Sequence, residues 1–143
     1  MRRSGAAERG SVTLWMMGLG LMILTLGGLS VDLWRLIAER RELAVMAEAA
    51  AVAAVNAIDT EEFRRSGGVV LDGGEALLLA EGSLLAQPRG ADVFLAPDWF
   101  VLEDEATVVV RLRRTVEFTL LRIAGAEPVV IGASARAVAE VRP

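Results

Sequence analysis

The chain contains 143 residues with a formal net charge of −4, and hydrophobic residues make up 54% of it. This length suffices for one small domain and an anchor, and it is too short for two sizeable domains. The absence of cysteine and histidine excludes disulfides, thiolate zinc sites and Ser–His–Asp triads. All the positive charge comes from arginine, and the arginines form no long cluster, so no nucleic-acid footprint is evident.

Residues 11–31 contain no charged side chain, and a helix of about 20 residues spans the roughly 30 Å hydrocarbon core of a bilayer. We therefore predict a transmembrane helix over 11–31, after a short basic leader at 1–10. A cleaved signal would have a shorter apolar region that ends at a small-residue site, but the first alanine triplet here is Ala49–Ala51. Arg2, Arg3 and Arg9 precede the span, and the charges behind it roughly cancel. This bias predicts a cytoplasmic N-terminus and an extracytoplasmic C-terminal part.

Four residues are predicted to mark the membrane boundaries. Trp15 and Trp34 bracket the apolar run, and tryptophan is enriched at membrane interfaces. Asp32 and Arg35 follow the run directly. A carboxylate at that depth needs a partner, which is either Arg35, three residues along the same helix, or an arginine of another protein.

No proline or glycine interrupts the chain after Asp32, so the same helix is expected to continue over 32–58 and to end near Asp59–Thr60. The extension is rich in strong helix formers. Its apolar positions follow helical spacing, and its alanines allow another element to pack closely; these positions are Leu36, Leu43, Met46, Ala50 and Ala53.

Residues 59–143 are predicted to form an outer α+β domain. Asp72 and Glu75 have the spacing of a capping box at a helix start. This assigns both carboxylates to capping, not to catalysis. The leucines that follow are expected to share one face of that helix, which Pro88 and Gly90 close; they are Leu77, Leu78, Leu84 and Leu85.

Strands are predicted in "ADVFLA", "DWFVLE" and "TVVVRLRR", and in a last strand of alternating small residues, with "FTLLRI" as one helical turn. Pro97 separates the first two. The last strand should place one set of residues on one face, namely Val129, Ile131, Ala133, Ala135, Ala137, Ala139 and Val141. The expected fold is a half-buried antiparallel sheet with helices on one side.

The polar groups of this domain indicate no catalytic, cofactor or metal site. Glu103, Asp104 and Glu105 are adjacent, and clustered carboxylates can bind calcium, but a polar hairpin turn explains them better. Asp98 beside Trp99 is likewise assigned to a turn. The arginines at 111, 113 and 114 are predicted to form one exposed strand face suited to an acidic partner.

Two stretches resemble the TadE/TadG-like family of tight-adherence (Flp) pilus-assembly proteins. In that family an apolar run opens after a short "RG" and precedes V-D-x-x-R, a basic cluster, a leucine and an alanine-rich tract. The matching residues here are "ERGSV" at 8–12, Val31, Asp32, Arg35, Arg40, Arg41, Leu43 and 47–54. The end of the chain, "RTVEFTLLRIAGAEPVVIGASARAVAEV", resembles the end of such domains. The resemblance implies a pilin-like fold, in which an anchor helix continues into a small sheet.

The resemblance also implies a candidate processing site between Gly10 and Ser11, because prepilin peptidases cut after a glycine between a basic leader and an apolar helix. Pilins and TadE-like members usually carry glutamate at the fifth position after the cut. Trp15 stands there, which moves the match toward the TadG-like side.

The resemblance therefore implies a membrane-anchored minor pilin or assembly factor of a tight-adherence pilus, acting by noncovalent contacts with pilin or assembly proteins and with membrane lipid. The alternative is a generic single-pass anchor or sensor subunit of a secretion or envelope complex. An enzyme is disfavoured because no nucleophile–base set is present. No cofactor, small-molecule substrate or nucleic acid is expected.

Overall fold

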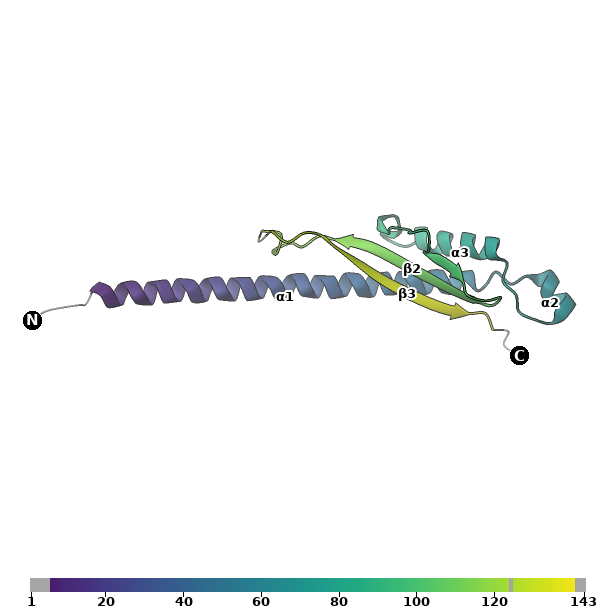
Figure 1. Ribbon diagram of the computed structural model, residues 1–143, viewed down its shortest axis with the longest axis horizontal. Coiled ribbons are helices and arrows are strands. Elements are labelled where there is room, and N and C mark those ends of the chain that lie inside the picture. Colours follow the sequence, from purple (N-terminus) through teal and green to yellow (C-terminus); the bar gives the residue numbers. More distant parts are fainter. Residues whose placement is uncertain (1–5, 124, 141–143) are drawn as a thin grey trace, which may run out of the picture. The chain divides into compact units, whose positions relative to one another are not determined.

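The computed structural model describes residues 6–123 and 125–140, and its contacts divide the chain into two compact units. Unit 1 consists of Met1–Leu36 and Glu117–Glu127, and unit 2 consists of Ile37–Val116 and Pro128–Pro143. The fold class is α+β, as predicted, with a long N-terminal helix followed by further helices and an antiparallel sheet (Figure 1).

Helix α1 extends over Ala6–Ala54 and contributes to both units. In unit 1, the large apolar side chains between Val12 and Val31 are exposed. Among the described residues, one helical stretch is long and apolar enough to cross a membrane, and it is the Ser11–Ala54 part of α1. Because exposed leucine, isoleucine and methionine side chains are stable in hydrocarbon and not in water, this helix fits a membrane anchor.

In unit 2, α1 has one buried face made mainly of small residues. Leu43 and Met46 are its large members. They are accompanied by a series of buried alanines at helical spacing, Ala47, Ala50, Ala51 and Ala54. The predicted packing surface is therefore confirmed at Leu43, Met46 and Ala50, whereas Leu36 and Ala53 are only half-buried.

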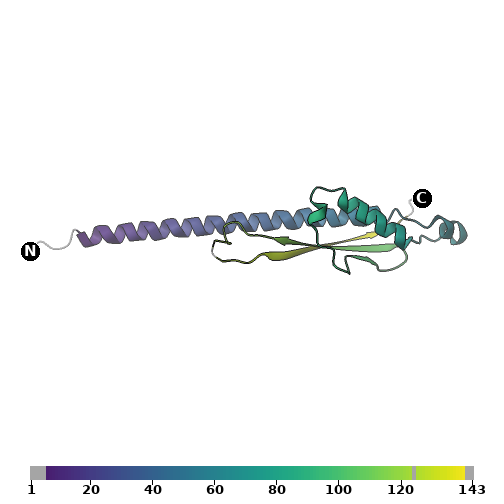
Figure 2. The same cartoon turned by 90° about the horizontal axis from the view of Figure 1, so that it is seen from above.

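The sheet contains β1 (Phe100–Leu102), β2 (Thr107–Val116) and β3 (Val129–Val138) in the order β1-β2-β3, with both pairs antiparallel. The unit 2 part of α1 lies on the same side of this sheet as α3 (Figure 2). Val108, Val110 and Leu112 of β2 are fully buried. They lie opposite Ala137, Ala135 and Ala133 of β3, respectively, so the predicted alternation is confirmed from Ile131 to Ala137 and continues at buried Ala139 after the strand, whereas Val129 is exposed. Val141 lies outside the described residues.

The helix extension ends earlier than predicted, and a short helix follows that the sequence analysis missed. The last turns of α1 tighten, since Asn56 and Ala57 donate backbone hydrogen bonds three residues back instead of four. Helix α2 (Thr60–Ser66) begins because the Asp59 carboxylate accepts hydrogen bonds from the N–H groups of residues 61 and 62. It ends at Gly67, whose φ of 75° is the left-handed cap that glycine favours.

Helix α3 (Gly73–Leu85) starts where it was predicted, with Asp72 as its N-cap. Asp72 Oδ1 accepts from the N–H groups of Gly74 and Glu75. The reciprocal half of the capping box is not formed, because the Asp72 N–H donates to Ala57 O. The predicted leucine face was wrong. Leu77, Leu78 and Leu85 are exposed, and the buried residues are Ala76, Ala80 and Leu84, because the side that packs inward is the one with small residues every fourth position.

Two further segments differ from prediction. "ADVFLA" is not a strand: it begins with the 3₁₀ helix η1 (Gly90–Asp92), and only Phe94 pairs with β2, at Arg113. A turn closes the segment, since Trp99 N–H donates to Ala96 O before β1 begins. "FTLLRI" forms hydrogen-bonded turns instead of a helical turn, because its backbone donors are drawn to a carboxylate of α1, as described below.

Two glycines near α3 should respond oppositely to alanine. A Cβ on Gly90 would lie 2.0 Å from Leu84 O, whereas a Cβ on Gly82 would meet nothing within 4 Å. We expect Gly90→Ala to lower the free energy of unfolding by about 2 kcal/mol or more, because backbone must move. Gly82→Ala should raise it by roughly 0.5–1 kcal/mol, because glycine costs entropy inside a helix. Chemical denaturation in detergent measures both, and equal effects would contradict the packing described.

Candidate functional site

Asp32, at the outer end of the apolar run, has a carboxylate that binds the loop between β2 and β3. Its Oδ1 accepts from the N–H of Thr119 at 2.9 Å, and its Oδ2 accepts from the N–H groups of Leu120 and Leu121 at 2.9 and 2.7 Å. Asp32 is only 2% exposed. Three hydrogen bonds to an ionised acceptor are individually strong, so this residue fixes the loop to α1 within unit 1.

The predicted ion pair between Asp32 and Arg35 does not form, and the alternative, an arginine of another protein, stays a prediction. Among the ion pairs of the described residues, none joins Asp32 to Arg35. Arg35 Nη1 instead donates to Thr119 Oγ1 at 2.7 Å, so both charged residues of the V-D-x-x-R motif bind the same loop. The backbone N–H groups of a loop were not considered because they carry no signature in the sequence.

Gly28, one turn before Asp32, provides the second contact with this loop. A Cβ there would lie 3.2 Å from Leu120 Cδ1 and 3.3 Å from Leu120 Cβ. The absence of a side chain thus lets Leu120 approach the helix closely. This gives one glycine of the apolar run a packing role, and it explains how the loop can lie against α1.

The remaining boundary and processing residues are found on α1. Trp15 and Trp34 are 73% and 75% exposed, and their placement at the two membrane interfaces stays a prediction. Gly10 and Ser11 are within the helix. Cleavage between them also stays a prediction.

An ionic cluster lies in unit 2 between α1, the segment after α3, and β2; Arg114 and Glu39 are buried in it, whereas Arg89 and Glu42 are partly exposed. Arg114 Nη1 and Arg89 Nη1 lie 3.1 and 3.0 Å from Glu39 Oε2. Glu42 is 3.1 Å from Arg89 and 3.4 Å from Arg114. The second Arg114 amino group donates to Met46 Sδ and to Arg89 O. Two arginines therefore face two glutamates, and the cluster links three elements.

This cluster corrects the predicted basic face, because Arg114 is 2% exposed. Its position in β2 has the same parity as Val108, Val110 and Leu112, which point inward. The alternation of inward and outward residues along β2 would have predicted a buried Arg114, but the three arginines were grouped by their charge.

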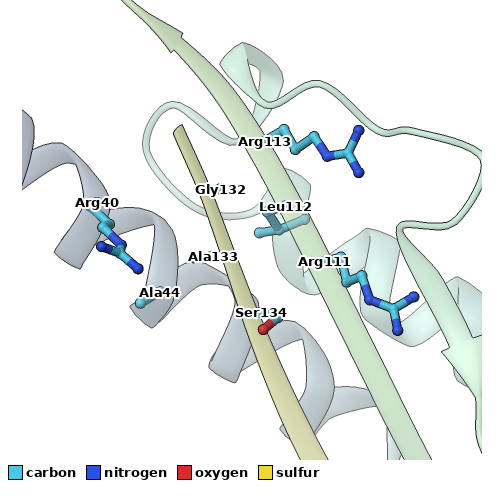
Figure 3. Close-up of a pocket in the computed structure, with 8 residues that line it drawn as sticks. All are labelled: Arg40, Ala44, Arg111, Leu112, Arg113, Gly132, Ala133 and Ser134. Carbon is cyan, nitrogen blue, oxygen red and sulfur yellow. The ribbon is translucent and has the colours of Figure 1, made fainter. Parts of the chain in front are cut away.

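The other two arginines of β2 are partly exposed and lie near Asp98. Arg111 Nη1 and Arg113 Nη2 are each 3.9 Å from Asp98 Oδ2. Both line a cavity of about 410 Å³ that Arg40 also borders. Figure 3 shows that Arg40 extends from α1 on one side of the strands while Arg111 and Arg113 extend on the other. The three guanidinium groups do not converge on one anion.

The acidic residues 103–105 form the turn between β1 and β2. Asp104 Oδ1 accepts from the Ala106 N–H, and Asp104 Oδ2 accepts from the Thr107 hydroxyl, both at 2.9 Å. Glu103 pairs with Arg136 at 3.1 Å. Across residues 6–123 and 125–140, no group of three or more acidic side chains is placed to hold a metal ion. Trp99 packs against Phe100 with ring centroids 5.7 Å apart.

The ionic cluster predicts a large effect of one conservative substitution. Glu39→Gln should lower the free energy of unfolding by roughly 3 kcal/mol, because it leaves a buried arginine short of its partner. Glu48→Gln, on an exposed position of the same helix, should change it by less than about 0.5 kcal/mol. Replacing Glu39 and Arg114 together by leucine should recover most of the loss. Denaturation followed by tryptophan fluorescence measures all three, and a Glu39→Gln value equal to that of Glu48→Gln would contradict the role of the cluster.

The β1–β2 turn should stabilise the fold in a pH-dependent way. The hydrogen bond from the Ala106 N–H, and next the one from the Thr107 hydroxyl, lower the pKa of Asp104 below its usual 3.8. Stability from this carboxylate is therefore present above pH 4 and is lost as the pH falls through the lowered pKa. Asp104→Ala should lower the Tm at neutral pH, and its difference from the parent should shrink in acid. Glu105→Ala removes the same charge, and an identical pH profile for the two variants would refute this assignment.

Comparison with known proteins places the Asp32 site inside a recognised family segment. Residues 10–57 match the family model Tad, described as putative Flp pilus-assembly TadE/G-like. No curated protein and no solved structure matches the chain. The matched segment contains Gly28, Asp32 and Arg35, and it supports involvement in Flp pilus assembly with protein partners of that system. The resemblance to the TadE/TadG-like pilus-assembly family is thus confirmed over residues 10–57.

Proposed function

We propose that this protein is a membrane-anchored minor pilin or assembly factor of a tight-adherence pilus and that it acts by noncovalent protein contacts, without catalysis. It crosses the cell membrane once, with the N-terminus in the cytoplasm and residues 59–143 outside. The division of the chain into a leader at 1–10, a span at 11–31, an extension at 32–58 and an outer domain at 59–143 belongs to this proposal.

The observation that carries the proposal is the coincidence of the family match with α1. Residues 10–57 include both the exposed apolar stretch from Ser11 and the buried small-residue face of Leu43 to Ala54. The first property suits lipid, and the second supplies part of a folded core. A segment with both properties anchors a domain and helps to build it, which is what a pilin-like subunit needs.

The proposed noncovalent action is supported by the charged side chains, several of which form ion pairs or hydrogen bonds within the fold. Glu39, Glu42 and Arg114 are engaged with one another, and Asp32 and Asp104 are engaged with backbone N–H groups. Arg111 and Arg113 are partly exposed, and each lies 3.9 Å from the same partly exposed carboxylate, that of Asp98. They offer the outer domain a basic strand face for an acidic protein partner.

Deletion tests this function directly. In a host with a tight-adherence pilus, deletion of the gene should abolish or strongly reduce surface pili, and the full chain should restore them. A variant truncated after Asp59 should still enter the membrane fraction, because it retains α1, but it should not restore pili. Electron microscopy and a shear-fraction immunoblot for the major pilin measure the outcome, and normal piliation of the deletion strain would refute the proposal.

The absence of native cysteine allows a matched topology control. Glu81→Cys, on the exposed side of α3, should react with a membrane-impermeant maleimide in intact spheroplasts. In the uncut chain, Ser4→Cys should react only after permeabilisation. The reverse pattern would contradict the proposed orientation. Intact mass of the extracted protein distinguishes a retained start from a cut between Gly10 and Ser11.

A further inference from the structure

We propose that the β2–β3 loop, residues 117–123, is a second membrane contact, which enters the outer interface of the bilayer beside the transmembrane helix. The inference rests on the membrane anchor of the proposed function and adds a lipid-binding element outside α1. Its partner is the bilayer itself, with acyl chains against the apolar side of the loop and head groups against the polar side.

The position of the loop along α1 is the first support. Leu120 packs on Gly28, which lies three residues inside the predicted outer end of the span at Val31. At 1.5 Å per residue, this contact is about 4.5 Å toward the membrane centre. Asp32 binds the loop backbone just outside that end. The loop is therefore held where hydrocarbon and head groups meet.

The loop has an apolar side, as expected of a segment at the boundary between hydrocarbon and head groups. Ile123 is 84% exposed and Leu120 is 42% exposed. With Leu121 they line an apolar groove of about 710 Å³ whose other wall is the span itself, including Ile23, Leu24 and Val31. Because exposed residues of an apolar span face lipid, the groove continues a lipid-facing surface, and acyl chains are the occupants that fit it.

Charged and polar groups gather on another side of the loop. Arg35, Glu117, Thr119 and Arg122 border a second cavity of about 390 Å³, together with the apolar side chains of Phe118 and Ile123. Arg122 pairs with Glu117 at 3.4 Å, and both side chains are exposed. Arginines at this level can interact with lipid phosphates, and Trp34 is exposed on the same segment of helix, as is typical of interfacial residues.

The backbone N–H groups of the loop have the hydrogen-bond acceptors that a medium of low polarity requires. Irregular backbone is costly in lipid unless its N–H groups have partners. The N–H groups of residues 119, 120 and 121 donate to Asp32. The N–H group of residue 123, and those of residues 125 and 126 just after the loop, donate to the carbonyl groups of residues 120, 122 and 121, respectively. Four N–H groups of the loop and two that follow it thus have protein acceptors.

Site-directed spin labelling tests this contact. Ile123→Cys, in the full chain reconstituted in phosphatidylcholine–phosphatidylglycerol vesicles, carries a nitroxide label. Leu24→Cys serves as the lipid reference and Arg64→Cys, on α2, as the water reference. We expect the label at 123 to collide more with oxygen than with a water-soluble nickel chelate, as at 24 and opposite to 64. A label at 123 that behaves like that at 64, while 24 stays protected, would overturn the inference and leave the anchor intact.

Two further results of the labelling experiment would point to a different explanation. If the label at 24 is also open to the nickel chelate, the membrane anchor fails and the proposed function fails with it. If labels at 123 broaden one another and dilution with unlabelled protein removes the broadening, the groove binds a second copy, which overturns lipid as its occupant.

The role of Asp32 in holding the loop has its own control. Asp32→Ala should increase nickel access at residue 123 several-fold, because the loop loses three hydrogen bonds to α1. Asp59→Ala removes a carboxylate that caps α2 in unit 2 and should leave access at 123 unchanged. The label at 24, measured in the Asp32→Ala background, verifies that the helix remains inserted. Unchanged access at 123 in that inserted variant would show that Asp32 does not hold the loop in the interface.

Discussion

A carboxylate at the end of an apolar helix requires hydrogen-bond donors, and this requirement shapes unit 1. Asp32 is 2% exposed, and a buried charge without donors costs several kcal/mol. The donors come from Thr119, Leu120 and Leu121, 87 to 89 residues away. The loop gains in turn, because three of its N–H groups obtain acceptors that no strand or turn of the loop provides. The carboxylate of Asp32 and the N–H groups of the loop thus satisfy each other, and neither is left buried without a hydrogen-bond partner.

In unit 2 a different constraint operates, which is the small size of the residues on the buried face of α1. Ala47 and Ala50 are completely buried there, and alanine buries less apolar area per residue than leucine. The ionic cluster around Glu39 fixes how β2 lies against α1, since the hydrogen bond from Arg114 to Glu39 forms only in one register of the two elements. Small side chains thus leave the packing of the helix weakly specified, and charged groups select one arrangement.

Features with a local or periodic cause could be predicted from the sequence. The long helix follows from an uninterrupted series of helix formers, and the sheet follows from the alternation of residues 107–114 and 129–139. The predictions were wrong where charge or hydrophobicity was considered without the position of the residue on its strand or helix. Arg114 was grouped with its neighbours by charge, although its parity places it in the core. The leucines of α3 were judged by hydrophobicity, although its alanines form the stripe that packs inward.

The clearest limit of sequence reasoning is seen by comparing four aspartates with the same chemistry. Asp59, Asp72 and Asp104 each accept backbone hydrogen bonds from residues two or three positions ahead. Spacing alone can indicate such contacts, and for Asp72 it did. Asp32 makes the same kind of bond to N–H groups that become neighbours only when β2 and β3 pair and direct their loop to the helix. No spacing rule reaches that far, because every residue except proline carries the same N–H donor. A charged residue that follows an apolar span without a local partner is therefore informative in itself: it indicates that a distant segment of backbone must fold back to it.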